Sequence, residues 1–211
     1  MKKGLDRDVA MGVIRQVAIG QPAIWCAPMH VAAKKNGKPR RVVDFQGLNK
    51  ACKRQTHPTK APFLQCQAVA PGTFRTTMDA WNGYHSVPLR EEDRQYTQFL
   101  TPWGWYEYCN LPQGHMAAGD AYTARLDDIT KDYEQMERCV DDTILWDDSV
   151  EEHFDRVCQF ITLCSRSGIT FNQEKFFFCR KEVEFLGFLL TEDSVKPSPD
   201  MLKSLANFPE P

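Results

Sequence analysis

Two adjacent carboxylates interrupt an apolar stretch of the chain. Asp141 and Asp142 stand between Arg138-Cys139-Val140 and Thr143-Ile144-Leu145-Trp146, a pattern typical of two short strands joined by a tight acidic turn. Neighbouring side chains of a straight strand point to opposite faces, so the turn is what could bring both carboxylates together. Clustered carboxylates are costly without a positive partner, and hard cations such as Mg²⁺ prefer carboxylate oxygen. The pair is a candidate metal site, and a solvated acidic turn is the alternative.

A third carboxylate closes another predicted strand. Asp79 ends the stretch Phe74–Asp79, 62 positions before Asp141, so the sequence alone does not show that the two meet. The elements around them are predicted as strand 74–79, helix 117–134, the acidic hairpin and helix 149–167. This βαββα order is that of a split-βαβ, ferredoxin-like arrangement, which can set two strand ends beside each other.

The second of these helices begins with a capping box, Ser149-Val150-Glu151-Glu152, and Gly168 ends it. Glu152 and His153 in its first turn are residue types that could ligate a metal ion. We predict instead that both lie on a solvated helix face.

Composition limits the function classes. The chain has 211 residues, of which 42% are hydrophobic and 26% charged, as in a globular protein with a sizeable core. No apolar run approaches the about 20 residues that span a bilayer, so no membrane partner is expected. The eight cysteines contain no Cys-x-x-Cys pair, which favours reduced thiols over zinc ligands or a disulfide framework.

A basic segment contrasts with an acidic remainder. Between Lys34 and Lys60 nine basic residues face one acid, so this segment carries +8 and the rest of the chain −10. The contrast suits a protein that holds a polyanion at one place and metal ions at another, with a solvated basic face as the alternative. Asn36-Gly37 predicts a hairpin turn here, whose tip could fold over a triphosphate.

Other elements follow from local patterns. Apolar residues between 5 and 19 predict a short helix. Residues 96–101 and 105–108, around Pro102-Trp103-Gly104, predict a second hairpin. Val183 to Leu190 predicts a last strand pair bent at Gly187.

Six motifs, in order, resemble those of reverse transcriptases from retroviruses and LTR retrotransposons, best the Ty3/gypsy-type group. They are Arg41-Val42-Val43-Asp44-Phe45-Gln46-Gly47-Leu48-Asn49-Lys50, Asp79 with Tyr84-His85-Ser86-Val87-Pro88-Leu89, Leu111-Pro112-Gln113-Gly114, Val140-Asp141-Asp142, Gly168-Ile169-Thr170-Phe171-Asn172-Gln173-Glu174-Lys175 and Phe185-Leu186-Gly187-Phe188.

The resemblance implies an α+β right-hand polymerase fold with a ferredoxin-like palm. Its implied segments are fingers at 1–54 and 88–117, palm at 55–87 and 118–195, and at 196–211 the start of a connector to an absent thumb. The chain would then be a piece of a polyprotein, whose thumb, RNase H and integrase regions are expected downstream.

The resemblance also implies roles for individual residues. Asp79, Asp141 and Asp142 would be the catalytic metal ligands, with Lys175 as acid for the departing pyrophosphate or as an ordinary surface lysine. Nucleotide-binding roles fall on Lys34, Lys35, Lys38, Arg40, Tyr84 and Gln113, with Tyr84 excluding a 2′-hydroxyl. The primer grip would comprise Phe185, Leu186 and Gly187.

These residues imply RNA-directed DNA polymerisation with two Mg²⁺ ions, for which Mn²⁺ is a substitute. The partners would be an RNA or DNA template with primer, and dNTPs. The implied location is intracellular and cytoplasmic, with virus-like particles as one setting. The alternative function is an inactive or domesticated remnant that binds nucleic acid or protein.

Overall fold

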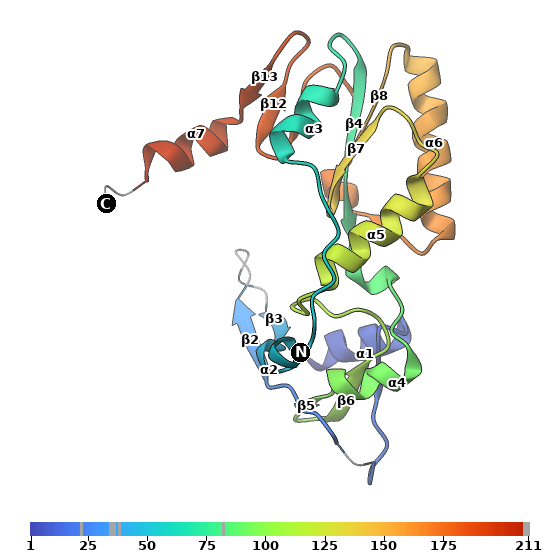
Figure 1. Cartoon of the computed structure of the whole chain (residues 1–211), viewed down its shortest axis with the longest axis vertical. Coiled ribbons are helices and arrows are strands. Elements are labelled where there is room, and N and C mark those ends of the chain that lie inside the picture. Colours follow the sequence, from blue (N-terminus) through green and yellow to red (C-terminus); the bar gives the residue numbers. More distant parts are fainter. Residues whose placement is uncertain (22, 34–36, 38, 82, 209–211) are drawn as a thin grey trace. The chain divides into compact units, whose positions relative to one another are not determined.

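The computed structural model describes residues 1–21, 23–33, 37, 39–81 and 83–208 (Figure 1). The chain divides into two compact units, each described by itself: unit 1 is Met1–His57 with Tyr84–Tyr122, and unit 2 is Pro58–Gly83 with Thr123–Pro211. Helix α5 (Ala118–Thr130) begins in unit 1 and runs into unit 2. Over the described ranges, no helix combines the length and apolar character that crossing a membrane requires.

Unit 2 is built on an antiparallel five-stranded sheet in the order β10-β4-β8-β7, with β9 added on β4. The strands are β4 (Phe74–Trp81), β7 (Met136–Cys139), β8 (Asp142–Asp147), β9 (Thr170–Phe171) and β10 (Phe177–Arg180). Helix α6 (Val150–Arg166) packs on the sheet against β4 and β8. The chain order β4-α5-β7-β8-α6 confirms the predicted βαββα body.

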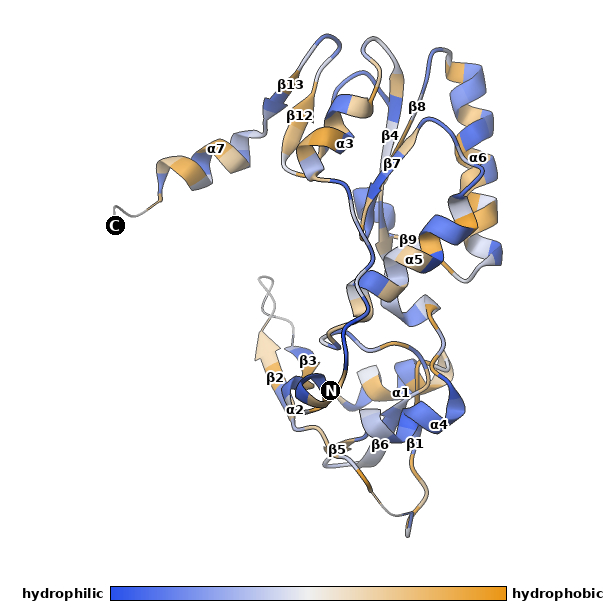
Figure 2. Ribbon diagram, viewed as in Figure 1, coloured by the Kyte–Doolittle hydropathy of each residue, from blue (hydrophilic) through white to orange (hydrophobic). Residues whose placement is uncertain are grey.

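Helix α6 has the start that its sequence predicts. Ser149 is the N-cap, and its hydroxyl accepts a hydrogen bond from the Glu152 N–H at 3.3 Å. Figure 2 shows hydrophobic and hydrophilic residues interleaved along this helix, as expected for an element with one buried face. That face includes Val157, Phe160 and Cys164.

The prediction that His153 lies on a solvated face is wrong, because its side chain is fully buried. Its Nδ1 lies 2.8 Å from Asp147 Oδ2, and its Nε2 lies 2.6 Å from Thr76 Oγ1. His153 shares the helical spacing of Val157 and Phe160, which places it on the inward face despite its polarity. The contacts join β4, β8 and α6 through one buried side chain.

A second sheet of unit 2 has the order β11-β12-β13, from Val183–Phe185, Phe188–Leu190 and Val195–Pro197. Together with α3 (Pro62–Ala68) and β8 it encloses one core, which comprises Cys66, Val69, Ile144, Trp146, Val183, Phe185 and Leu190. The segment predicted to be a connector contributes β13 and then α7 (Pro199–Ala206). Ser198 caps α7 and Pro199 begins it, which explains why a Pro-containing stretch forms a helix.

Unit 1 contains a three-stranded sheet, a separate hairpin and several short helices. The sheet has the order β1-β6-β5, from Ile14–Gln16, Gly104–Tyr108 and Phe99–Thr101, and the hairpin pairs β2 (Met29–Ala33) with β3 (Pro39–Val43). The helices are α1 (Lys2–Ala10), α2 (Gln46–Ala51), η1 (Gly83–Ser86), α4 (Glu91–Arg94) and η2 (Gln95–Thr97). Both predicted hairpins are confirmed, although the strand predicted at 96–101 is shortened to β5 because Gln95–Thr97 forms η2. The tip residues Lys34, Lys35, Asn36 and Lys38 lie outside the described residues.

The single helix predicted between residues 5 and 19 is wrong. Helix α1 ends at Ala10, Gly12 turns the backbone at a φ of 70°, and Ile14–Gln16 pairs with β6 as a strand. The buried Ile14 belongs to the same core as Leu5, so both elements satisfy one apolar pattern. Pairing with a distant strand overrides the local helical period.

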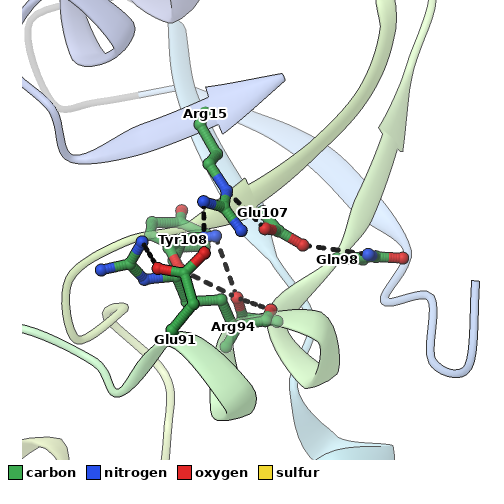
Figure 3. A network of polar contacts seen from close by, with 7 residues as sticks. Arg15, Glu91, Arg94, Gln98, Glu107 and Tyr108 are labelled. Atoms are coloured by element: carbon green, nitrogen blue, oxygen red, sulfur yellow. Dashed lines mark hydrogen bonds and ion pairs between the residues drawn. The ribbon is translucent and has the colours of Figure 1, made fainter. Parts of the chain in front are cut away.

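A polar network fastens β1 to β6 (Figure 3). Arg15 Nε donates to Glu107 Oε1 at 2.7 Å, and its Nη1 lies 2.5 Å from Glu91 Oε1. Gln98 Nε2 donates to the second Glu107 oxygen at 3.0 Å. Glu107 is only 5% exposed, so these donors supply the hydrogen bonds that its charge needs.

Arg15→Ala is expected to lower the free energy of unfolding by about 1 kcal/mol or more, because Glu107 would keep its burial and lose its cationic partner. Urea denaturation of the whole chain measures the change. Lys203→Ala is the matched control, since its pair with Asp200 is 74% and 88% exposed and should not affect stability. Equal losses in both variants would contradict the role assigned to Arg15.

Candidate active site

The register between β4 and β8 sets Asp79 directly opposite Asp142. Residues paired across antiparallel strands lie on the same face, with Cβ atoms about 4.5–5.5 Å apart. The structure therefore brings together two carboxylates that the sequence could not show to meet. Like charges in such a pair repel, so the arrangement is costly unless a cation offsets it.

The hairpin that carries Asp141 turns in two residues. Cys139 pairs with Asp142, which leaves Val140 and Asp141 as the loop. Val140 has a φ of 53°, a conformation that is strained for a β-branched residue. The Ala80 N–H donates to the Asp141 carbonyl at 2.8 Å and ties the turn to β4. The surrounding strands thus hold Asp141 beside the end of β4.

Burial and mutual repulsion perturb the two hairpin carboxylates. Burial raises the pKa of Asp141 to about 6, and the negative charges of Asp79 and Asp142 add to the effect. The pKa of Asp142 is also raised, first by burial and then by Asp79. Both groups are costly to ionise as they stand, which is typical of carboxylates that act on a cation or a substrate.

Lys175 supplies one positive charge to this cluster. Its Nζ lies 2.5 Å from Asp79 Oδ2, and this hydrogen bond, with the nearby carboxylates, raises the lysine pKa. The loop that carries it, η3 (Gln173–Lys175), is anchored to β4, because the Asn172 N–H donates to the Asp79 carbonyl at 2.8 Å. Lys175 is 59% exposed, so its ammonium keeps access to solvent or a ligand.

The carboxylates fit a divalent cation in their chemistry. Asp141 Oδ1 is buried and, among the described residues, has no hydrogen-bond partner, which is costly for an anionic oxygen. Over all the residues that the structure describes, no three His, Cys, Asp or Glu side chains converge as a ready-made metal site. Asp79 is paired with Lys175 instead. A metal role for Asp79, Asp141 and Asp142 stays a prediction.

The predicted nucleotide-binding residues that can be described lie in unit 1. Arg40, on β3, donates from Nη2 to Gln113 Oε1 at 2.7 Å, which joins the hairpin to the Leu111–Gly114 motif. Arg40 and Gln113 are both exposed. Lys34, Lys35 and Lys38 lie outside the described residues.

Tyr84 lies in η1, where its half-buried ring packs edge-on against Tyr122 at a centroid distance of 5.6 Å. Tyr122 is fully buried in α5. The ring of Tyr84 therefore packs against α5, and its role in excluding a 2′-hydroxyl stays a prediction.

The predicted primer grip forms the turn between β11 and β12. Phe185 is 3% exposed and belongs to the core of unit 2. Leu186 and Gly187 have φ values of 51° and 82° and form the tip. Of the three residues, only these two could touch a ligand at the surface.

The chain resembles known proteins over most of its length. The profile described as "Reverse transcriptase (RNA-dependent DNA polymerase)" matches residues 32–190. The chain belongs to the reverse transcriptase family. The predicted family is thereby confirmed on grounds independent of the site geometry.

Relatives of this reverse transcriptase domain include transposon polyproteins of Drosophila melanogaster. It is 31% identical to the Pol polyprotein of transposon gypsy over 180 residues, which are 83% of this chain and 17% of the relative. Identity to the Pol polyprotein of transposon opus is 27% over 190 residues, or 89% and 19% of the two chains. The chain thus spans less than a fifth of the length of either relative, and the Ty3/gypsy-type prediction is confirmed.

The fold matches solved reverse transcriptase structures. Superposition on a foamy viral protease–reverse transcriptase in complex with double-stranded DNA gives a TM-score of 0.89, covering all of this chain and 36% of that one at 22% identity. A native prototype foamy virus protease–reverse transcriptase gives 0.79 at 24% identity, over 94% and 26% of the chains. The predicted α+β polymerase fold is confirmed.

Sequence reasoning did not single out Asn172 or strand β9, which both shape this candidate site. Asn172 anchors the lysine loop, and its Oδ1 also accepts from the Glu174 N–H at 3.1 Å. An Asn two residues before a Glu at a strand end is a recognisable capping signal. No local pattern predicts the pairing of β9 with β4, because β9 is only two residues long.

In metal-free protein, Asp141→Asn is expected to raise the melting temperature by a few degrees at pH 7.5. A folded-state pKa of about 6, above the ordinary 3.8, means that ionisation of Asp141 opposes folding. This penalty is absent below about pH 4, develops between pH 4 and 6 and is complete above that range. Thermal melts from pH 4 to 8 with a chelator measure it.

Asp148→Asn is the matched control, since Asp148 is exposed and close in sequence. Its melting temperature should follow that of the unsubstituted chain at each pH. A fall in stability for Asp141→Asn, or a gain of equal size at pH 4, would show that Asp141 carries no such electrostatic cost.

Proposed function

We propose that the chain is an RNA-directed DNA polymerase, which transfers nucleotides from dNTPs to a primer 3′-hydroxyl on an RNA or DNA template. The observation that carries the proposal is the strand register that opposes Asp79 and Asp142. Beside them lies the buried Asp141 oxygen, which has no hydrogen-bond partner within the described ranges. Reverse transcriptases generally depend on divalent metal. Metal ions held by such carboxylates stabilise the entering and leaving oxygens of an in-line displacement at phosphorus.

The residues of the chain then have separate tasks. Asp79, Asp141 and Asp142 would hold two Mg²⁺ ions, or Mn²⁺ in their place. Lys175 is protonated at neutral pH and would give its proton to, or neutralise, the departing pyrophosphate. Its bond to Asp79 would be exchanged for the phosphate on binding.

In unit 1 the proposed tasks concern the nucleotide itself. Arg40 would bind the triphosphate, and Gln113 would bound the sugar pocket. Lys34, Lys35 and Lys38 are proposed to assist Arg40 from the hairpin tip. Tyr84 would exclude a ribose 2′-hydroxyl. In unit 2, Leu186 and Gly187 would touch the primer while Phe185 supports them from the core.

The whole polyprotein and its surroundings enter as part of the proposal. The relatives are Pol polyproteins many times longer than this chain. We propose that the chain works with thumb, RNase H and integrase regions of such a polyprotein, in the cytoplasm or in virus-like particles.

Asp141→Asn should reduce Mg²⁺-dependent primer extension by at least about a hundredfold, because an electrostatic stabiliser of the reacting phosphate is lost. Extension of a labelled DNA primer on an RNA template with dNTPs measures the rate. Circular dichroism confirms that the variant is folded, and Asp148→Asn serves as the control that should retain activity. Extension at the unsubstituted rate by folded Asp141→Asn would refute the catalytic assignment.

Tyr84→Val should raise the ratio of kcat/KM for ribonucleotides over deoxynucleotides by roughly tenfold or more, since removing the ring opens room for a hydroxyl. Single-nucleotide incorporation with matched rNTP and dNTP pairs measures the ratio. Tyr96→Val is the control, because Tyr96 is 39% exposed and outside the proposed pocket. An unchanged ratio in an active Tyr84→Val enzyme would leave Tyr84 only its packing against Tyr122.

A further inference from the structure

One side chain of α2 holds the loop that carries Gln113. Asn49 Nδ2 donates to the Gly114 carbonyl at 2.9 Å, and the Met116 N–H donates to Asn49 Oδ1 at 2.9 Å. A side-chain amide has one donor group and one acceptor oxygen, and in Asn49 both form hydrogen bonds to the same loop. Two bonds of opposite polarity fix both the position of the loop and the orientation of the amide.

The segment that leads into α2 contacts the same loop at further points. Arg40 donates to the Gln113 side chain at 2.7 Å. Gly114 has a φ of 94°, and a Cβ built on it would lie 3.7 Å from the Val43 carbonyl oxygen and 3.8 Å from Phe45 Cδ2. The stretch from Arg40 to Asn49 therefore forms a continuous support for the Gln113–Met116 loop.

Helix formation does not explain an Asn at this position. Asn lies inside α2, where Ala is the more favourable residue by about 0.5 kcal/mol. The residue is half-buried, while Gln113 and Gly114 are exposed. Its amide thus serves a surface loop rather than the core, and such a loop needs specific bonds to keep one conformation.

We infer that Asn49 is a positioning residue that fastens the Gln113 loop to the β2–β3 hairpin through α2. Arg40 and Gln113 are thereby presented to a nucleoside triphosphate as one preassembled surface. The inference rests on the proposed function and adds a residue that touches no substrate. When the loop is already ordered, nucleotide binding does not bear the entropy cost of ordering it. Losing the Asn49 bonds should therefore weaken nucleotide affinity more than it slows the chemical step.

Two substitutions test the inference in the whole chain. Asn49→Ala removes both bonds and favours the helix, so α2 is retained. Asn49→Asp keeps an acceptor for the Met116 N–H and places an oxygen where the Gly114 carbonyl needs a donor. Asn207→Ala is the control of the same residue type, at the exposed end of α7.

Hydrogen exchange of the Met116 amide, followed by NMR, tests whether Asn49 holds the loop, and it does not require enzymatic activity. Exchange should quicken at least tenfold in Asn49→Ala and stay near the unsubstituted rate in Asn49→Asp and Asn207→Ala. Unchanged Met116 exchange in Asn49→Ala would overturn the inference, because the amide would then be protected by something else.

Single-nucleotide incorporation tests the consequence. The KM for dNTP should rise about tenfold in both Asn49 variants, with kcat within about threefold and Asn207→Ala unchanged. The positioning role would be overturned if Asn49→Ala exposed the Met116 amide to exchange but left the KM for dNTP unchanged. It would also be overturned if Asn49→Asp had the same KM as the unsubstituted chain. If the unsubstituted chain adds no nucleotide with Mg²⁺, the proposed function fails. Met116 exchange then still decides whether Asn49 holds the Gln113–Met116 loop.

Discussion

The unit that carries the aspartates depends on one constraint, the fixed pairing of β4 with β8. This register places Asp79 opposite Asp142 and, through the Ala80 N–H, holds the Asp141 turn beside them. A slip of one residue would turn every side chain of one strand to the opposite face and separate the two carboxylates. Apolar side chains on the same strands make such a slip costly, since Met78, Ile144 and Leu145 are each 1% exposed or less.

The same pairing concentrates negative charge where water is partly excluded. Burial and repulsion raise the pKa of Asp141 and Asp142, and Val140 has a strained backbone. Such costs persist only where the surrounding structure outweighs them. The buried contacts of His153 with Thr76 and Asp147, together with the apolar core of unit 2, supply that structure at the other end of β4 and β8. The stability of the rest of the unit thus maintains a costly cluster of carboxylates at one end of β4 and β8.

In unit 1, hydrogen bonds and ion pairs fix the positions of several strands and loops. The proposed nucleotide-binding residues Arg40 and Gln113 are exposed, so directional bonds rather than burial fix their positions. Arg15 with Glu107 fixes β1 on β6, and Arg40 with Asn49 holds the Gln113 loop. Hydrogen bonds of this kind contribute about 1 kcal/mol each, and their larger effect is to select one geometry.

The sequence by itself determined the elements with strong local signals and the family. The capped helix α6, the Asn-Gly hairpin and the strand that begins at Phe74 follow from periodicity, capping and turn residues, and ordered motifs identified a reverse transcriptase. The structure extends that strand beyond the predicted end at Asp79 to Trp81, because Ala80 and Trp81 pair with β9. Only the tertiary structure decided which distant segments pair. It turned Ile14–Gln16 into a strand, buried His153, paired Lys175 with Asp79 and set Asn49 on the Gln113 loop. The physical reason is that local patterns report the preferences of neighbours along the chain, whereas these outcomes depend on partners 65 or more positions away or on burial against other elements.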